Sequence, residues 1–133
     1  MTRHMRSLSI GIAALALIAL APGLCEAKRI VIRENTNNKN IVVSRGDILQ
    51  IVLAGNPTTG YSWQVGQLDP RIFKLLREPE YRQTQQAIGG GGFYSFELAG
   101  MAPGAAAVTL VYLRPWEKKK PPAKTFRINV MVK

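Results

Sequence analysis

The clearest structural signal in this chain of 133 residues is the stretch Thr125-Phe126-Arg127-Ile128-Asn129-Val130-Met131-Val132. Phe126, Ile128, Val130 and Val132 alternate with Arg127, Asn129 and Met131, so a bulky apolar side chain recurs at every second position. Because successive side chains of a β-strand point to opposite faces, this period of two predicts a strand with one buried face. A protein built from sheets is therefore the first expectation.

Shorter stretches upstream show related patterns, and no segment is long and periodic enough to predict a helix with assurance. We expect strands at Lys28–Glu34, Ile41–Ser44, Asp47–Ala54, Tyr61–Val65, Glu78–Gln83, Phe93–Ala99 and Ala106–Leu113. Pro79 should keep its strand at a sheet edge. Between residues 67 and 77 the pattern is weaker, and Asp69-Pro70 favours a single helical turn that buries Phe73 and Leu76.

About seven main strands in roughly 100 residues, with Trp63 on the third, are typical of an immunoglobulin-like domain. The sequence therefore predicts an all-β fold, an immunoglobulin-like antiparallel β-sandwich of about seven strands. The chain has one Cys, so an intramolecular disulfide cannot form and stability must come from core packing.

The first 27 residues have the pattern of a secretory signal peptide. Arg3, His4 and Arg6 precede an apolar run over residues 8–21 that is too short to span a membrane. Cys25-Glu26-Ala27 offers small residues for cleavage after Ala27. Lipid anchoring at Cys25 is the alternative, although Leu24 is not the small residue that such a signal needs. We expect residues 1–27 to be removed, residues 28–133 to form one domain, and the protein to be exported, either periplasmic or secreted.

Cleavage changes the charge and the chemistry of the chain. The whole sequence has 18 Lys+Arg and 8 Asp+Glu, a formal net charge of +10. Loss of Arg3, Arg6 and Glu26 leaves 16 basic and 7 acidic residues, a net charge of +9, and leaves no Cys and no His. This composition excludes Ser-His and Cys-His nucleophiles, a His general base and a His/Cys metal site. We therefore expect no catalytic residues, no metal and no cofactor.

Carboxylate chemistry stays open as an alternative. Glu78 and Glu80 would share a strand face across Pro79, and Glu117 lies near the second Trp. Two solvated acids beside Arg77 and Arg82 explain the first pair better than a catalytic dyad does. We do not expect an enzyme.

Three unusual loops should lie together. In an antiparallel sandwich, successive connections alternate between the two ends, which places residues 55–60, 84–92 and 114–124 at the same end. The first contains Asn56-Pro57-Thr58-Thr59-Gly60-Tyr61, in which Pro57 and Gly60 favour a stiff turn. The second contains Gly89, Gly90, Gly91 and Gly92, a run typical of a backbone that lies close against another surface or of a flexible linker.

The third loop reads Arg114-Pro115-Trp116-Glu117 and continues into a Lys-rich segment, residues 118–124. Trp and Arg are enriched at binding hot spots, so Trp116 is a candidate exposed anchor, unless it folds over the sandwich end as a lid. The Lys-rich segment is interpreted as a solvated hairpin tip.

Taken together, Asn56-Pro57-Thr58-Thr59-Gly60-Tyr61, the G-x-G-G pattern at Gly89–Gly92 and Arg114-Pro115-Trp116 resemble the motifs of one family, the chagasin-type protein inhibitors of papain-like cysteine proteases. Each motif is short, but their order and spacing cover nearly the whole mature chain. The resemblance also implies an immunoglobulin-like sandwich, in agreement with the strand pattern.

The resemblance implies a reversible block of the protease by three loops inserted as a wedge. Asn56, Pro57, Thr58, Thr59 and Gly60 would lie over the catalytic Cys and His, with Thr58 closest. Gly89, Gly90, Gly91 and Gly92 would pair with the protease main chain on the non-primed side, and Arg114, Pro115 and Trp116 would pack on the primed side. Tyr61 is expected to belong to the core or to support the loop and not to contact the protease.

The expected partner is a papain-like cysteine protease of the same organism, a host or a competitor, and the inhibitor is expected to be a monomer. No nucleic acid is expected as a partner, and no membrane after signal cleavage. The alternative function is a basic, secreted immunoglobulin-like binding module for an anionic partner (polysaccharide, nucleic acid or membrane surface), suggested by the net charge and the Lys-rich segment.

Overall fold

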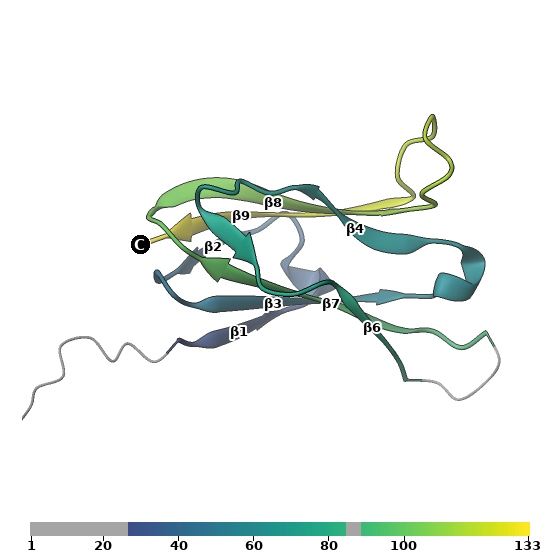
Figure 1. Cartoon of the computed structure of the whole chain (residues 1–133), viewed down its shortest axis with the longest axis horizontal. Coiled ribbons are helices and arrows are strands. Elements are labelled where there is room, and N and C mark those ends of the chain that lie inside the picture. Colours follow the sequence, from purple (N-terminus) through teal and green to yellow (C-terminus); the bar gives the residue numbers. More distant parts are fainter. Residues whose placement is uncertain (1–26, 85–88) are drawn as a thin grey trace, which may run out of the picture.

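Two β-sheets packed face to face form the protein (Figure 1). The computed structural model describes residues 27–84 and 89–133. The predicted signal peptide, except for Ala27, therefore lies outside the described residues, as do Ala87 and Ile88 of the second loop.

The first sheet has the strand order β1-β3-β7-β5, and β6 also pairs with β7. Its strands are β1 (Arg29–Ile32), β3 (Ile48–Gly55), β5 (Phe73–Leu75), β6 (Glu80–Gln83) and β7 (Gly92–Gly100). The second sheet has the order β2-β9-β8-β4 and consists of β2 (Asn40–Val43), β4 (Ser62–Gln67), β8 (Gly104–Leu113) and β9 (Lys124–Val132). Two short 3₁₀ turns, η1 (Glu34–Thr36) and η2 (Pro57–Thr59), join strands.

The core lies between the sheets and is filled by alternate residues of the four long strands, as the period of two predicted. Its fully buried residues include Leu49, Ile51 and Leu53 of β3, Phe96 and Leu98 of β7, Val108 and Leu110 of β8, and Phe126, Ile128 and Val130 of β9. Met131, on the outer face of β9, is 48% exposed. The predicted all-β sandwich is confirmed.

Two edge pairs differ from a purely antiparallel sandwich. β1 pairs with β3 in parallel, and β2 pairs with β9 in parallel. After β1 the chain turns at η1, crosses to the other sheet as β2 and turns again at residues 45–47 before it enters β3. Because β1 and β3 are separated by this excursion, they run in the same direction. With β2 and β5 counted, the described residues form nine strands instead of about seven.

The segment before β6 also differs from the expectation. The carbonyl of Asp69 accepts hydrogen bonds from the N–H groups of Ile72 and Phe73, so one turn does form. The chain then continues as strand β5, in which Phe73 pairs with Gly100. Phe73 is buried as predicted, but Leu76 is 41% exposed, so the prediction for Leu76 was wrong. A helical spacing of three would have placed both inward, whereas in the strand Leu75 shares the inner face with Phe73.

The three predicted loops do lie at one end of the sandwich, at the right of Figure 1. They join β3 to β4, β6 to β7 and β8 to β9. The C-terminus lies at the opposite end, where the N–H of Lys133 bonds to Val43. The first described residues lie there as well, since the carbonyl of Lys28 accepts a hydrogen bond from Ile48 at the start of β3.

Candidate functional site

The loop between β3 and β4 is a short, internally bonded turn. Pro57, Thr58 and Thr59 form η2 and are exposed. Gly60 ends the turn with a φ of 83°, in the left-handed region that favours glycine. The hydroxyl of Thr59 donates to the carbonyl of Asn56 at 2.7 Å, which closes the turn on its own start.

Asn56 holds this turn and reaches beyond it. Its Oδ1 accepts hydrogen bonds from the N–H of Thr58 at 3.1 Å and from the hydroxyl of Thr58 at 2.6 Å. Its Nδ2 donates to the carbonyl of Gly89 at 2.7 Å, so the first and second loops are joined. One amide side chain therefore caps η2 and fixes the neighbouring loop.

Three of the four glycines of the second loop each occupy a different environment. Gly89 has a φ of 78°, and a Cβ there would meet open space. Gly92 belongs to β7, where a Cβ would overlap the main chain of Arg82 and Gln83 in β6. A Cβ on Gly91 would lie 3.3 Å from the carbonyl oxygen of Gly55. The backbone thus lies close against other surfaces of its own chain at Gly91 and Gly92, while Gly89 faces outward.

Arg114 joins the third loop to the first. Its Nε donates to the carbonyl of Thr59 at 3.1 Å, and its guanidinium lies 4.5 Å from the centre of the Tyr61 ring. Glu117 holds the same guanidinium through Nη1 at 3.3 Å. The stacking of Tyr61 under Arg114 and on Tyr112 agrees with its predicted role as loop support.

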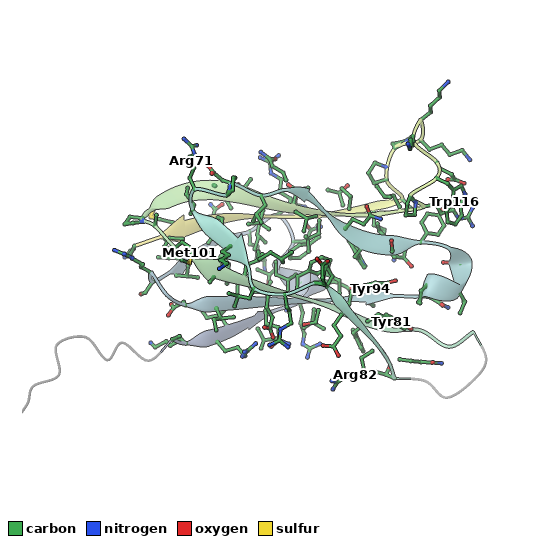
Figure 2. The ribbon with its side chains drawn as sticks, in the orientation of Figure 1. Arg71, Tyr81, Arg82, Tyr94, Met101 and Trp116 are labelled. Atoms are coloured by element: carbon green, nitrogen blue, oxygen red, sulfur yellow. The ribbon has the colours of Figure 1, made fainter. Side chains whose placement is uncertain are left out.

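Trp116 is 66% exposed, the most exposed of the large hydrophobic side chains described (Figure 2). The edge of its ring lies over Gly60, where an added Cβ would overlap it. The side chain therefore touches the first loop without covering the end of the sandwich. This exposure favours an anchor over a lid.

Sequence reasoning missed the side chains that support the loops from the core. The hydroxyl of Tyr112 in β8 accepts a hydrogen bond from the N–H of Asn56 at 3.0 Å, and Nε1 of Trp63 donates to the carbonyl of Ala54 at 2.9 Å. Both bonds fasten the end of β3 to the opposite sheet. A buried Tyr or Trp near a strand end must find a polar partner, and that is the signal that could have pointed to them.

Tyr94 supports the same region from β7. Its hydroxyl lies 3.5 Å from the carbonyl of Tyr61, and its ring would lie 2.7 Å from a Cβ on Gly55. Burial raises the pKa of Tyr94, and Tyr112 and Tyr81 raise it further. The phenol therefore keeps its proton well into the alkaline range and remains a hydrogen-bond donor to the loop.

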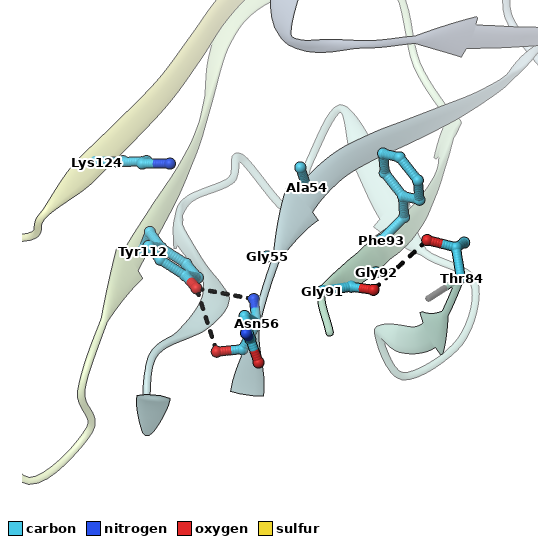
Figure 3. A pocket seen from close by; sticks show the side chains of 9 residues that line it. All are labelled: Ala54, Gly55, Asn56, Thr84, Gly91, Gly92, Phe93, Tyr112 and Lys124. Carbon is cyan, nitrogen blue, oxygen red and sulfur yellow. Dashed lines mark hydrogen bonds between the residues drawn. The ribbon is translucent and has the colours of Figure 1, made fainter. Parts of the chain in front are cut away.

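A hollow of about 340 Å³ lies at the base of the first two loops (Figure 3). Gly55 and Asn56 line it together with Gly91 and Gly92, which adjoin them in the first sheet, and Tyr112 of the opposite sheet faces them. The hydroxyl of Tyr112 bonds the main chain of Asn56 at its rim. The hollow therefore lies where the two sheets meet beneath the loops.

Other groups at this end give no sign of catalysis. Glu117 is engaged by Arg114 and Lys120, and Glu80 lies 3.8 Å from Arg82. Lys118, Lys119 and Lys120 are exposed, as expected of a solvated hairpin tip. Among the described residues there is no group of three or more His, Cys, Asp or Glu that could hold a metal ion. Within the same part of the chain, no helix has the length and apolarity needed to cross a bilayer.

A family model described as chagasin family peptidase inhibitor I42 matches residues 42–130, well over half of the chain and all three loops. The chain belongs to the chagasin family of peptidase inhibitors. Membership confirms the resemblance seen in the three motifs, and it confirms that the protein is an inhibitor and not an enzyme.

Known relatives agree with this assignment. Amoebiasin-1 of Entamoeba histolytica is 37% identical over 102 residues, which cover 74% of this chain and 95% of the relative. Chagasin of Trypanosoma cruzi is 32% identical over 84 residues, 60% of this chain and 76% of chagasin.

Solved structures show the same fold. The crystal structure of the cysteine protease inhibitor EhICP2 from Entamoeba histolytica superposes with a TM-score of 0.73 at 23% identity, covering 81% of this inhibitor and 98% of EhICP2. PbICP-C, solved in complex with falcipain-2, superposes with a TM-score of 0.54 at 25% identity, covering 80% of this inhibitor and all of PbICP-C. The immunoglobulin-like sandwich is thus the fold that this inhibitor shares with its relatives.

Proposed function

We propose that this inhibitor acts on papain-like cysteine proteases as a monomer, by inserting its three loops into the active-site cleft. The observation that carries the proposal is the joined loop end. Asn56 bonds the second loop and Arg114 bonds the first, while Trp116 projects as an exposed aromatic side chain. Loops that are already ordered lose little entropy on docking, which favours tight binding from a small surface.

The conformation of the first loop suits a block without cleavage. Proteases bind substrate segments as extended strands. Here Pro57, Thr58 and Thr59 form a 3₁₀ turn whose ends are hydrogen-bonded to Asn56. In this proposal Thr58 lies nearest the catalytic Cys and His, but the peptide bonds of the turn are not offered in an extended form.

The other two loops would flank the cleft. Gly89 and Gly90 would run along the non-primed side and pair their main chain with that of the protease. Gly92 is already paired with Gly55 and Gln83 and would hold the base of this loop. Arg114, Pro115 and Trp116 would pack on the primed side, with the indole ring as the main apolar contact. PbICP-C was solved bound to falcipain-2, which supports a protease as the partner.

Titration of papain with the purified protein tests the proposal, with inhibition expected in the nanomolar range. The double variant Thr58→Val/Trp116→Ala should weaken inhibition by at least roughly 30-fold, because truncation of a central interface aromatic costs about 2 kcal/mol or more. Its melting temperature should fall by about 5 °C or less, since both side chains are exposed and the one hydrogen bond lost, from the Thr58 hydroxyl to Asn56, costs about 1 kcal/mol.

Met101→Ala is the matched control. Met101 is 49% exposed and lies at the end opposite the loops, at the left of Figure 2. This variant should inhibit papain as the wild type does. Papain activity that persists at micromolar protein would overturn the proposal, as would equal losses in the control and the double variant.

We further propose export, to the periplasm or outside the cell, with residues 1–27 removed as a signal peptide. The basic start, the apolar run and the small residues before Lys28 support this. Mass spectrometry of the exported protein should find a chain that begins at Lys28, whereas a lipid on Cys25 would show the alternative anchoring.

A further inference from the structure

Arginines that are far apart in the sequence gather on the outer face of the five-stranded sheet. Arg29 belongs to β1 and Arg33 follows it, while Arg77 and Arg82 come from the segment of β5 and β6 on the other side of β7. We call these four residues, with the sheet surface between them, the arginine groove. None of the four belongs to the three loops.

Three arginines of the groove, Arg33, Arg77 and Arg82, line a hollow of about 460 Å³. Arg29 adjoins the hollow through its ion pair with Glu97. The floor of the hollow is made by Gln50 and Val52 of β3 and by Ser95 of β7, and Phe93 lies along it toward the loop end. Nε2 of Gln50 donates to the hydroxyl of Ser95 at 3.1 Å, and Glu97, two residues further along β7, adds a carboxylate to the lining.

The two ends of the groove differ in how their arginines are paired. At the end away from the loops, Glu97 accepts from Arg29 at 2.8 Å and from Arg77 at 3.2 Å, and its side chain is only 12% exposed. These two guanidinium groups are held by a carboxylate.

Toward the loop end the positive charge is available to a ligand. The side chain of Arg82 is 81% exposed and reaches Glu80 only at 3.8 Å (Figure 2). Arg33 is exposed and has no ion pair among the described residues. Four arginines against two glutamates leave this face with two uncompensated positive charges. The hollow therefore presents guanidinium groups on opposite rims and hydrogen-bonding side chains between them.

We propose that the arginine groove binds an anionic polysaccharide that carries sulfate or carboxylate groups. Guanidinium groups bind such oxyanions through paired hydrogen bonds, and Arg33 and Arg82 would take one group each from opposite rims. Gln50 and Ser95 would bond the hydroxyls of the intervening sugars. The exposed ring of Phe93 would pack against the C–H face of a sugar ring.

The same features disfavour two other polyanions. An acidic peptide bound as a strand would need free main-chain groups, but a sheet face offers only side chains. A nucleic acid carries an unbroken row of phosphates, whereas the groove places uncharged Gln50 and Ser95 between Arg33 and Arg82. Anionic groups spaced along a chain of hydroxyls match the alternation of arginine, amide and hydroxyl groups in the groove.

Titration of the purified protein with a heparin oligosaccharide tests the proposal, with isothermal calorimetry at several salt concentrations. Arg33→Gln/Arg82→Gln should weaken binding about tenfold or more. The slope of log K against log salt should fall by about two, one for each lost contact. Lys118→Gln/Lys119→Gln removes the same charge from an exposed loop tip and should weaken binding less than about threefold.

Equal losses in the two variants would overturn the proposal, because binding would then depend on net charge alone. Absence of heparin binding at low salt would overturn it as well. Tighter, Arg33- and Arg82-dependent binding of double-stranded DNA or polyglutamate would reject the polysaccharide in favour of that ligand. Papain inhibition and thermal unfolding should be unchanged in Arg33→Gln/Arg82→Gln, which separates the groove from the loop end.

Discussion

Asn56 forms hydrogen bonds to three different parts of the loop end. Its acceptor oxygen caps η2 through Thr58, its donor nitrogen holds Gly89, and its main-chain N–H bonds Tyr112. An amide is the side chain that offers a donor and an acceptor side by side, which neither Asp nor Ser does at this reach. The shape of two loops therefore depends on one residue type.

Two substitutions separate the functions of Asn56. Asn56→Asp keeps an acceptor for Thr58 but sets a carboxylate against the carbonyl of Gly89, and Asn56→Ala removes both contacts. Inhibition of papain should weaken about tenfold in Asn56→Asp and more in Asn56→Ala, since each lost hydrogen bond costs about 1 kcal/mol. Inhibition constants and thermal unfolding are the measurements. Wild-type inhibition by Asn56→Asp would show that the tie to Gly89 is unimportant.

At the scale of single residues, the sequence predicted which residues form the loops, but it did not predict the hydrogen bonds between the loops. Pro57 and Gly60 indicated a stiff turn because their backbone preferences are local. The bond from Asn56 to Gly89 spans 33 residues and depends on how two loops meet, so no local pattern could indicate it. Gly92 was expected to face another surface, and that surface is β6 of the same chain.

The loops rest on four long strands, β3, β7, β8 and β9. Their inner residues are completely buried, and β3 pairs with β7 over eight residue pairs, from Ile48 to Gly55. β3 and β8 both end at the loops. Packing between these strands therefore fixes the platform from which the loops project.

Loss of a central core side chain should destabilise this platform strongly. Phe96 of β7 is fully buried, so Phe96→Ala should lower the free energy of unfolding by about 3–5 kcal/mol. Met131→Ala, on the outer face of β9, should change it by less than about 0.5 kcal/mol. Chemical denaturation gives both values. A small effect of Phe96→Ala would mean that the core relaxes into the cavity.

The strands themselves were predictable, because each follows from a period of two in its own sequence. The pairing of the strands with one another was not predictable. The alternation in β3, β7 and β9 located these strands and their buried faces correctly. The parallel pairing of β1 with β3 depends on the crossing at η1, which a polar stretch of six residues, Asn35–Asn40, does not specify. β5 was missed because three residues are too few to distinguish a strand from a helical turn.

Net charge is a property of the whole molecule. It affects the rate at which a partner associates more than it affects the strength of the contacts in the complex. The domain after the predicted cleavage carries +9, and exposed lysines at 118–120 stand beside the binding loops. A protease with net negative charge would be attracted before it touches the loops.

The association rate constant with such a protease should fall about tenfold as salt rises from about 0.02 M to 0.5 M, with little change in the dissociation rate. Stopped-flow measurement of inhibition gives both constants. Lys118→Gln/Lys119→Gln should show a weaker salt dependence. A dissociation rate that rises steeply with salt would show that these charges lie within the contact.

The position of the three loops at one end of the molecule followed from strand parity alone. The arginine groove did not follow, because its four arginines lie between residues 29 and 82 and meet only after the sheet is formed. In the sequence these arginines are dispersed and form no basic run. The fold brings them onto one face of the sheet.

The chain enters and leaves the sandwich at the end opposite the loops. β8, with ten residues, spans most of the distance, about 33 Å at the usual rise of a strand. A fluorophore, an affinity tag or a solid support joined to Lys133 would therefore stand clear of a bound protease. An immobilised layer of this inhibitor would face its loops toward the solution, which makes the domain a ready capture reagent for the proteases it blocks.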